Sequence, residues 1–496
     1  MPRNSSRIIA PISAFLIPFT IRLIPEVLAW PHPIGFDTIY AYASWIESGY
    51  PLNLDLLTML KGARLFPLLA LLADRILFND AILTVKILGP FLHAFLGLSM
   101  YIFARKVLNW DAWKSLLLVV FTSVYFVSLR ISWEMYRQML GTIFLFLTLS
   151  CYWFSRSRWA TGATPFLALL TILSHEMTGV TLLALMLVEV IYGAIKRDEK
   201  LPAAVLSLLM GTAFLGYMLL DPATLSLKLP FETFIEGRAT LAGHILGFTI
   251  FCYAFLLPFM LYGVVRVRNR LVLSWLIIIL LPGIWPIIYP SLCPPLWFRW
   301  IIFMVYPMCI YSTEGIYALL SKRGSSKAPK AIALAYLCFI GITAGYYLAA
   351  DPEHAIPYFA DYNPYKAYIQ SSMLQSTIPL KDIEPTIQAT KWLSENAHGL
   401  IVLHEAFYPW AMRCGCSIGK PMVIRERDLS KPDRMNFADA LIEIANKASN
   451  ENREIYTIWW ANGKGWYNVP SLPSEFQLVK AFGDIGVYAF RGQNSS

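Results

Sequence analysis

Charged residues are scarce in this chain. Only 15% of its 496 residues are charged and 57% are hydrophobic, whereas about a quarter of the residues in a typical soluble domain carry charge. This composition excludes an ordinary soluble protein. Apolar segments of about 20 residues, long enough to cross a ~30 Å hydrocarbon core as helices, recur as far as residue 350 and then stop. We therefore predict a polytopic α-helical membrane protein.

The sequence also lacks the usual signatures of metal, disulfide and repeat proteins. Its seven cysteines show neither a zinc spacing nor an obvious disulfide framework. There is no HExxH motif, no solenoid repeat and no low-complexity segment. The net charge of +9 comes from short basic clusters between apolar segments, which is the pattern of topology signals. No nucleic-acid partner is predicted.

Eleven membrane spans are predicted, at residues 8–29, 81–104, 115–129, 140–154, 160–174, 177–195, 201–220, 242–264, 271–290, 300–319 and 331–350. The first is too long and too rich in proline for a cleaved signal peptide. Each even-numbered span ends at a basic cluster, so the positive-inside rule places the N-terminus in the cytoplasm of a cell-membrane protein. Residues 65–78 are expected to form an interfacial or re-entrant helix in the first outer loop.

The C-terminal part of the chain has a different pattern. Residues 384–395 and 436–448 have helical patterns, whereas GLIVLHEAF, EIYTIWW and FQLVKAFGDIGVYAF indicate strands. This alternation predicts a small α/β domain. The predicted domains are therefore a transmembrane domain, residues 1–350, and a soluble α/β domain, residues 351–496, which an odd number of spans places on the extracytoplasmic side of the membrane.

Asp37 is the first candidate site residue. It lies in the sequence GFD, directly after the first predicted span. A carboxylate at the membrane boundary, beside aromatic residues that limit water, is suited to take a proton from a hydroxyl or to hold a divalent cation. Asp37 also suits the N-cap of a helix that begins at Ile39, so capping is the alternative explanation.

Further ionisable residues fall in the predicted outer loops, where burial at the membrane boundary is costly. His175 and Glu176 occupy the turn between the fifth and sixth spans. They suit a base and its orienting or metal-sharing partner, or polar turn residues that contact lipid head groups. Arg299 lies among aromatic residues, and Arg238 has a similar setting; each suits a lipid phosphate or a snorkelling position in an aromatic belt.

The turn between the third and fourth spans adds four polar residues. Arg137 is a candidate phosphate ligand, and Glu134 and Tyr136 are further candidates. Glu134 stands four residues after Arg130 and three before Arg137, so internal ion pairs are the alternative.

Four polar residues inside the predicted spans have a structural interpretation. Arg22 and Glu26 are four residues apart and are expected to pair on one helix face. Lys86 and His93 lie in the second span, where helix packing can satisfy them.

Together these features resemble the GT-C superfamily of lipid-phosphosugar-dependent glycosyltransferases. The shared features are an acid after a first span with a cytoplasmic N-terminus, short helices in the loop that follows, paired polar turns and a C-terminal α/β domain. Residues 390–424 are also similar to the start of the soluble domain in oligosaccharyltransferase catalytic subunits. The WWDYG motif of those subunits is absent from that place, and residues 459–463 read WWANG, so oligosaccharyltransferase activity itself is not predicted.

The resemblance implies an inverting transfer of a sugar from a polyprenyl-phosphate donor, at the extracytoplasmic face. The acceptor would be a protein, a lipid or a glycan. Asp37 would be the base, or hold a divalent cation. The leaving phosphate would be stabilised by arginines drawn from Arg137, Arg238 and Arg299.

His175 and Glu176 would complete the acceptor or metal side of such a site. A cofactor, if the enzyme uses one, would be a divalent cation, Mg²⁺ or Mn²⁺, held by Asp37 and Glu176. Two other functions fit the sequence: a polytopic transporter or flippase for lipids or solutes, and a non-catalytic membrane scaffold.

Overall fold

The structure is a computed structural model. It describes residues 5–154, 158–219, 237–289, 297–321, 327–349, 378–413, 421–424, 437–450, 453–461 and 472–490. The chain divides into two compact units: the described residues up to Ala349 belong to the first, and those from Ile378 onward belong to the second. Each unit is described by itself.

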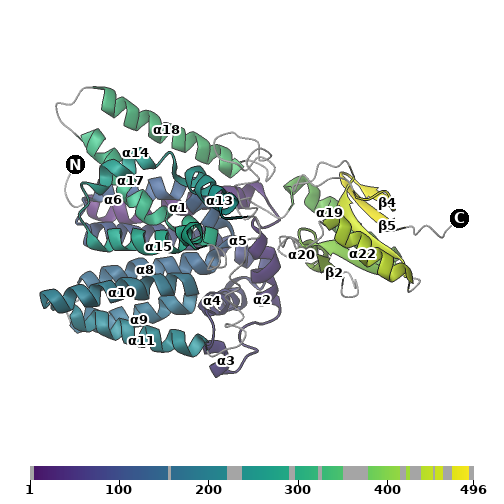
Figure 1. The fold of residues 1–496 in the computed structure, drawn as a ribbon, viewed down its shortest axis with the longest axis horizontal. Coiled ribbons are helices and arrows are strands. Elements are labelled where there is room, and N and C mark those ends of the chain that lie inside the picture. The colour runs from purple at the N-terminus through teal and green to yellow at the C-terminus, as the bar shows by residue number, and fades with distance from the viewer. Residues whose placement is uncertain are drawn as a thin grey trace. The chain divides into compact units, whose positions relative to one another are not determined.

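The first unit is entirely helical in its described residues (Figure 1). Its first part contains α1 (Ser5–Leu28), η1 (Thr38–Ala43), α2 (Ser44–Glu47), α3 (Leu56–Leu60), α4 (Leu65–Ala73), η2 (Asp74–Phe78) and α5 (Ala81–Lys106). The middle part contains α6 (Ala112–Val124), α7 (Phe126–Glu134), α8 (Tyr136–Trp153), α9 (Arg158–Ser174), α10 (Glu176–Lys196) and α11 (Leu201–Leu219). The last part contains α13 (Gly237–Tyr253), α14 (Leu257–Val264), α15 (Arg270–Ile288), α16 (Trp297–Phe303), α17 (Val305–Ser321) and α18 (Lys327–Ala349).

The described helices agree with a polytopic membrane protein. Seven of them are long and apolar enough to cross a membrane, or nine if each of two bent pairs is one span. The bent pairs are α6 with α7, at 67°, and α13 with α14, at 81°. The predicted spans at 140–154 and 160–174 form α8 and α9, which are not among these nine. The count of eleven spans therefore stays a prediction, as does the orientation in the membrane.

Short polar residues set where several helices begin. The Asp80 carboxylate accepts hydrogen bonds from the backbone N–H groups of Ile82 and Leu83, at 2.9 and 3.0 Å, and so caps α5. Asp111 caps α6 in the same way, and Asn269 caps α15. These caps satisfy donors that the first turn of a helix leaves unpaired. The predicted helix at 65–78 is present as α4 continued by η2.

Helices α14 and α17 pack in direct backbone contact at two glycines. A Cβ atom on Gly263 would lie 1.8 Å from the Tyr311 carbonyl oxygen, and one on Gly315 would lie 2.2 Å from the Phe259 carbonyl oxygen. No side chain fits at either position. Small residues at such a crossing allow two membrane helices to approach closely.

The second unit contains a mixed five-stranded sheet of strand order β2-β1-β3-β5-β4. Its elements are α19 (Leu380–Asn396), β1 (Leu400–His404), α20 (Tyr408–Arg413), β2 (Met422–Ile424), α22 (Phe437–Asn450), β3 (Ile455–Trp460), β4 (Phe476–Phe482) and β5 (Ile485–Phe490). Strand β1 pairs in parallel with β2 and β3, whereas β5 pairs antiparallel with β3 and β4. The strands and both helices predicted for this region are present.

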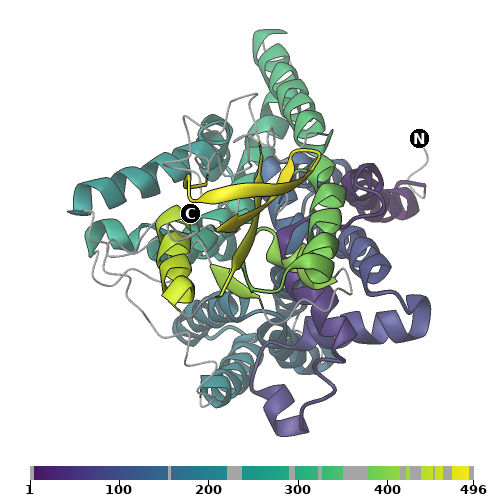
Figure 2. The ribbon, with the colours of Figure 1, turned by 90° about the vertical axis from the view of Figure 1, so that its right-hand side faces the viewer.

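Two neighbouring tryptophans show how this sheet is covered. Side chains alternate between the faces of a strand, so Trp459 and Trp460 on β3 point to opposite sides. Trp459 stacks on Phe437 of α22, with ring centroids 4.5 Å apart. The Trp460 indole N–H donates to the Asp382 carboxylate of α19 at 2.9 Å. The sheet therefore lies between α19 and α22, as Figure 2 shows.

Candidate functional site

Asp37 directly precedes η1 and does not cap it. Its backbone is already helical, with φ −64° and ψ −22°, and its side chain makes no capping hydrogen bond, whereas an N-cap residue normally has an extended backbone. The capping explanation is therefore wrong. Within the part of the chain that the structure describes, the Asp37 carboxylate forms no hydrogen bond and no ion pair.

The segment that carries Asp37 is fixed against the end of α7. Gly35 has φ +88°, and a Cβ atom there would lie 2.5 Å from the Trp133 carbonyl oxygen. The backbone N–H of Phe36 donates to the Glu134 carboxylate at 2.8 Å. The Tyr42 hydroxyl, on the other side of Asp37 in sequence, donates to the Glu134 carbonyl oxygen at 2.6 Å.

Three arginines from three helices act on the charge of Asp37: Arg130 of α7, Arg137 of α8 and Arg299 of α16. Arg130 pairs with Glu134, so one ion pair left open by the sequence is present. Arg137 pairs instead with Glu176 of α10, at 2.7 Å.

Each of these arginines keeps a buried nitrogen without an acceptor in the described residues. These atoms are Nε and Nη1 of Arg130, Nε of Arg137 and Nε of Arg299. No ion pair of Arg299 is found among the described residues. Because a buried N–H without an acceptor costs ~1–3 kcal/mol, these donors indicate a ligand that brings oxygen acceptors.

The environment of Asp37 raises the pKa of its carboxyl to about 6. The largest cause is burial, and the second is the negative charge of Glu134. Arg299, Arg130 and Arg137 act in the opposite direction. A carboxylate with a pKa near the working pH is suited to general base catalysis.

His175 lies in the turn between α9 and α10, as predicted, and is close enough to Arg137 and Arg299 to be influenced by their charges. Burial lowers the pKa of the His175 imidazole to about 3, and both arginines contribute to this decrease. The imidazole is therefore neutral at physiological pH. Its Nδ1 atom is buried and has no partner among the described residues.

Glu134 and Tyr136 lie at the junction of α7 and α8 and make structural contacts. Both carboxylate oxygens of Glu134 are used, one by Arg130 and the other by Phe36. Tyr136 is fully buried, and its hydroxyl accepts a hydrogen bond from Arg22 at 3.1 Å. The Tyr136 ring stacks on Tyr42 at 5.2 Å.

The polar residues predicted to be structural form a buried network. Arg22 pairs with Glu26 at 2.8 Å, as the spacing predicted. Lys86 pairs with the same carboxylate at 3.2 Å and also donates to the His32 carbonyl oxygen at 2.5 Å. This network ties α1 to α5 and to the segment that precedes Asp37. His93 is also buried.

Two further expectations about the site stay predictions. Arg238 lies in the first turn of α13, but its side chain is outside what the structure describes. The described residues contain no group of three or more His, Cys, Asp or Glu that could hold a metal ion. Glu176 is paired with Arg137, and the charges of three arginines act on Asp37; a divalent cation held by Asp37 and Glu176 stays a prediction.

Sequence reasoning missed Gln138 and Tyr42. Gln138 is 1% exposed, and neither its Nε2 nor its Oε1 has a hydrogen-bond partner among the described residues. Its position directly after Arg137, in a predicted outer turn, was the available signal. The neighbours of Tyr42 include Asp37, Arg137 and Glu134, which no local pattern indicates.

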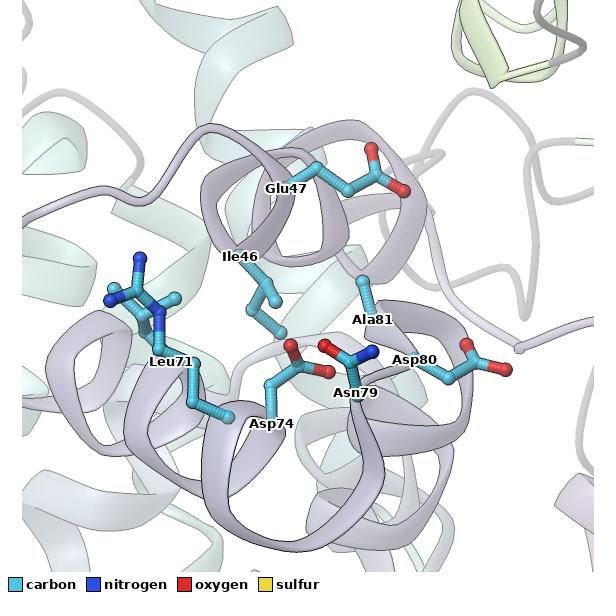
Figure 3. Close-up of a pocket in the computed structure, with 8 residues that line it drawn as sticks. Ile46, Glu47, Leu71, Asp74, Asn79, Asp80 and Ala81 are labelled. Carbon is cyan, nitrogen blue, oxygen red and sulfur yellow. The ribbon is translucent and has the colours of Figure 1, made fainter.

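A separate hollow of about 500 Å³ lies between α2, η2 and the start of α5 (Figure 3). Its lining includes the acids Glu47, Asp74 and Asp80. Asp74 accepts a hydrogen bond from Thr84 at 2.8 Å, and Asp80 caps α5. None of the predicted site residues lines this hollow, so we assign it no role in the site.

Of the comparisons with known proteins, the one with solved structures finds a match. No protein-family model and no curated protein matches the chain. Among solved structures, the chain is similar to the crystal structure of ArnT from Cupriavidus metallidurans bound to undecaprenyl phosphate, with 12% sequence identity and a TM-score of 0.46 over 99% of each chain.

Proposed function

We propose that this protein is a membrane glycosyltransferase that moves a sugar from a polyprenyl-phosphate donor to an acceptor. The observation that carries the proposal is the cluster at Asp37: an acid without an internal partner lies beside three arginines whose buried N–H groups lack acceptors. A phosphate ester supplies oxygen acceptors for those groups. The long apolar helices suit a substrate carried by a lipid, and the sequence resemblance to the GT-C superfamily supports the reaction class.

In the proposed reaction an acceptor hydroxyl attacks the anomeric carbon of the sugar from the side opposite the phosphate, which inverts the configuration. Asp37 accepts the hydroxyl proton as the new carbon–oxygen bond forms. The bond between the anomeric carbon and the phosphate oxygen breaks, and polyprenyl phosphate leaves. Arg299 and Arg137, with Arg238 as a further candidate, stabilise the negative charge of that phosphate.

The proposal gives His175 and Glu176 supporting roles. Glu176 holds Arg137 through their ion pair, which fixes the guanidinium for phosphate binding. The neutral imidazole of His175 is suited to hydrogen bond the acceptor without adding charge. We propose that the reaction takes place at the extracytoplasmic face and that the N-terminus lies in the cytoplasm, as the basic clusters between the spans predict.

The test is incubation of the purified protein in detergent micelles with polyprenyl-phosphate sugars and candidate hydroxyl acceptors. Mass spectrometry should detect a glycosylated acceptor and free polyprenyl phosphate. Asp37→Asn is expected to lower the rate by on the order of 10²-fold or more, because it removes the base. Asp55→Asn is the matched control, since Asp55 is an exposed acid in the same loop. Normal transfer by Asp37→Asn would exclude Asp37 as the base.

One observation favours the transporter alternative. The two bent helix pairs, at 67° and 81°, are of the kind that transporters use to line a substrate path. A transporter or flippase would move a fluorescent polyprenyl-phosphate lipid across a vesicle bilayer without forming a new glycosidic bond. Movement of that lipid, with no glycosylated product under any donor and acceptor, would support the alternative and contradict the transferase.

A further inference from the structure

We infer that Glu134 is the positioning residue of the site: it holds the segment around Asp37 so that the Asp37 carboxylate stays beside the arginines without bonding to any of them. The inference rests on the proposed function, in which Asp37 is the base. In this role Glu134 transfers no proton itself and acts by holding other groups in position.

Glu134 contacts residues that lie both before and after Asp37 in the sequence. One carboxylate oxygen accepts from Arg130, and the other accepts from the backbone N–H of Phe36 at 2.8 Å. The Glu134 carbonyl oxygen accepts from the Tyr42 hydroxyl at 2.6 Å. The Glu134 carboxylate therefore holds the backbone at the residue before Asp37, and the Glu134 backbone carbonyl holds the Tyr42 side chain five residues after it. Since Glu134 is only 6% exposed, water does not compete well for these bonds.

The close packing of Gly35 makes the attachment rigid. Its missing Cβ would lie 3.0 Å from the Glu134 Cβ and 2.5 Å from the Trp133 carbonyl oxygen. With φ +88°, the backbone here takes a conformation that glycine adopts without strain. The segment therefore lies directly on α7, and its position is set by Glu134 and its neighbours.

Glu134 also acts on Asp37 through its charge. The charged or titratable groups that influence Asp37 are Glu134, Arg130, Arg137, Arg299 and Tyr42. Glu134 forms an ion pair with Arg130, and it interacts through its charge with Asp37 and with three tyrosines, Tyr42, Tyr136 and Tyr347. Among the acids of this set, Glu134 is the like-charged neighbour that opposes ionisation of Asp37. Its neutralisation also releases Arg130, and both changes favour the ionised form of Asp37.

Two variants separate the charge of Glu134 from its role as an anchor. Glu134→Gln keeps an oxygen acceptor for the Phe36 N–H but removes the charge. We expect the acid limb of the pH profile for donor turnover to move to lower pH. Glu134→Ala also removes the acceptor of the Phe36 N–H, while the backbone carbonyl that binds Tyr42 remains. We expect kcat to fall by about 10²-fold with KM for the polyprenyl-phosphate sugar little changed, because misplacement of a reacting group by about 1 Å has this effect. Glutamine should therefore retain more turnover than alanine.

The matched control is Glu314→Gln. Like Glu134, Glu314 is an acid paired with a basic residue, here Lys114, in the same unit, and its side chain is 14% exposed. A purely structural role would lower the amount of folded protein without moving the acid limb, as expected for this control. A substrate-free readout is pH-difference infrared spectroscopy of the carboxyl C=O stretch, assigned to Asp37 by its loss in Asp37→Asn. Its midpoint should fall below the wild-type value of about 6 in Glu134→Gln.

The outcomes distinguish this inference from the proposed function. If Asp37→Asn is inactive but Glu134→Gln leaves both the acid limb and the infrared midpoint unchanged, the inference is wrong and the transferase stands. If Asp37→Asn transfers sugar normally, the proposed base is wrong, and the infrared midpoint alone decides whether Glu134 controls Asp37. Equal turnover of the alanine and wild-type proteins would also overturn the positioning role.

Discussion

Replacement of Asp37 by asparagine should stabilise the folded protein at alkaline pH. The pKa of the Asp37 carboxyl is raised from 3.8 to about 6, first by burial and then by the charge of Glu134. A carboxyl whose pKa is higher in the folded chain than in the unfolded chain favours folding while it is protonated. This contribution is complete below about pH 4 and is lost as the pH rises through about 6. Above that pH, the ionised carboxylate opposes folding.

The magnitude follows from the size of the pKa change. A rise from 3.8 to about 6 corresponds to about 3 kcal/mol, at 1.36 kcal/mol per unit of pKa. Asp37 is half-buried, so solvent screens part of its charge and this value is an upper limit. Asparagine has nearly the same size and no charge. We therefore expect Asp37→Asn to gain up to about 3 kcal/mol of unfolding free energy at pH 8 and almost nothing at pH 4.

Thermal unfolding in detergent micelles, followed by tryptophan fluorescence at pH 4, 6 and 8, measures this difference. Asp55→Asn is the control of opposite sign. The Asp55 carboxylate caps α3, and its hydrogen bonds with Thr58 lower the pKa of the Asp55 carboxyl, so its ionised form favours folding. Asp55→Asn should not gain stability at pH 8. An Asp37→Asn protein that is less stable than wild type at pH 8, or equally stabilised at every pH, would refute this reasoning.

Three further predictions concern other parts of the first unit. Arg299→Lys should lower sugar transfer by on the order of 10²-fold in a turnover assay, because a point charge does not replace the planar fork of a guanidinium at a phosphate. Gly263→Ala should lower the unfolding free energy by about 3 kcal/mol or more, because its methyl group would overlap a backbone carbonyl. Gly341→Ala is the control: a Cβ atom there has nothing within 4 Å, so thermal unfolding should show no such loss of stability. Arg270→Ala should lower the midpoint of thermal unfolding, at a cost of ~3–5 kcal/mol, because it leaves the fully buried Glu189 carboxylate without its paired arginine.

The sequence predicts those features that depend on local spacing. Apolar length indicates most of the long helices, and residue spacing indicates the ion pairs Arg22–Glu26 and Arg130–Glu134, since residues four apart share a helix face. Short segments rich in β-branched and aromatic residues likewise indicate β3 and β5. These predictions need no knowledge of how distant segments of the chain pack.

The parts of the site that the sequence did not predict depend on long-range contacts. Arg137 stands three residues after Glu134, yet it pairs with Glu176, 39 positions further along the chain. Asp37 has the sequence context of a helix cap, yet a hydrogen bond between Phe36 and Glu134, 98 positions apart, fixes its segment with Asp37 already in a helical conformation. At both places, long-range contacts rather than local sequence preference therefore determine the pairing and the backbone conformation.

The distribution of partners within the site is itself informative. Glu134 and Glu176 each hold an arginine, whereas Asp37 and Arg299 influence one another's charge but form no ion pair in the described residues. Direct pairing of the two would lower the pKa of Asp37 and satisfy a buried guanidinium nitrogen, so a fold selected for stability alone would be expected to bring them together. Among the described residues, the site therefore keeps an unpaired carboxylate and a buried guanidinium nitrogen without an acceptor. The proposed sugar transfer needs both groups unpaired, because one would accept the proton of the acceptor hydroxyl and the other would bind the departing phosphate.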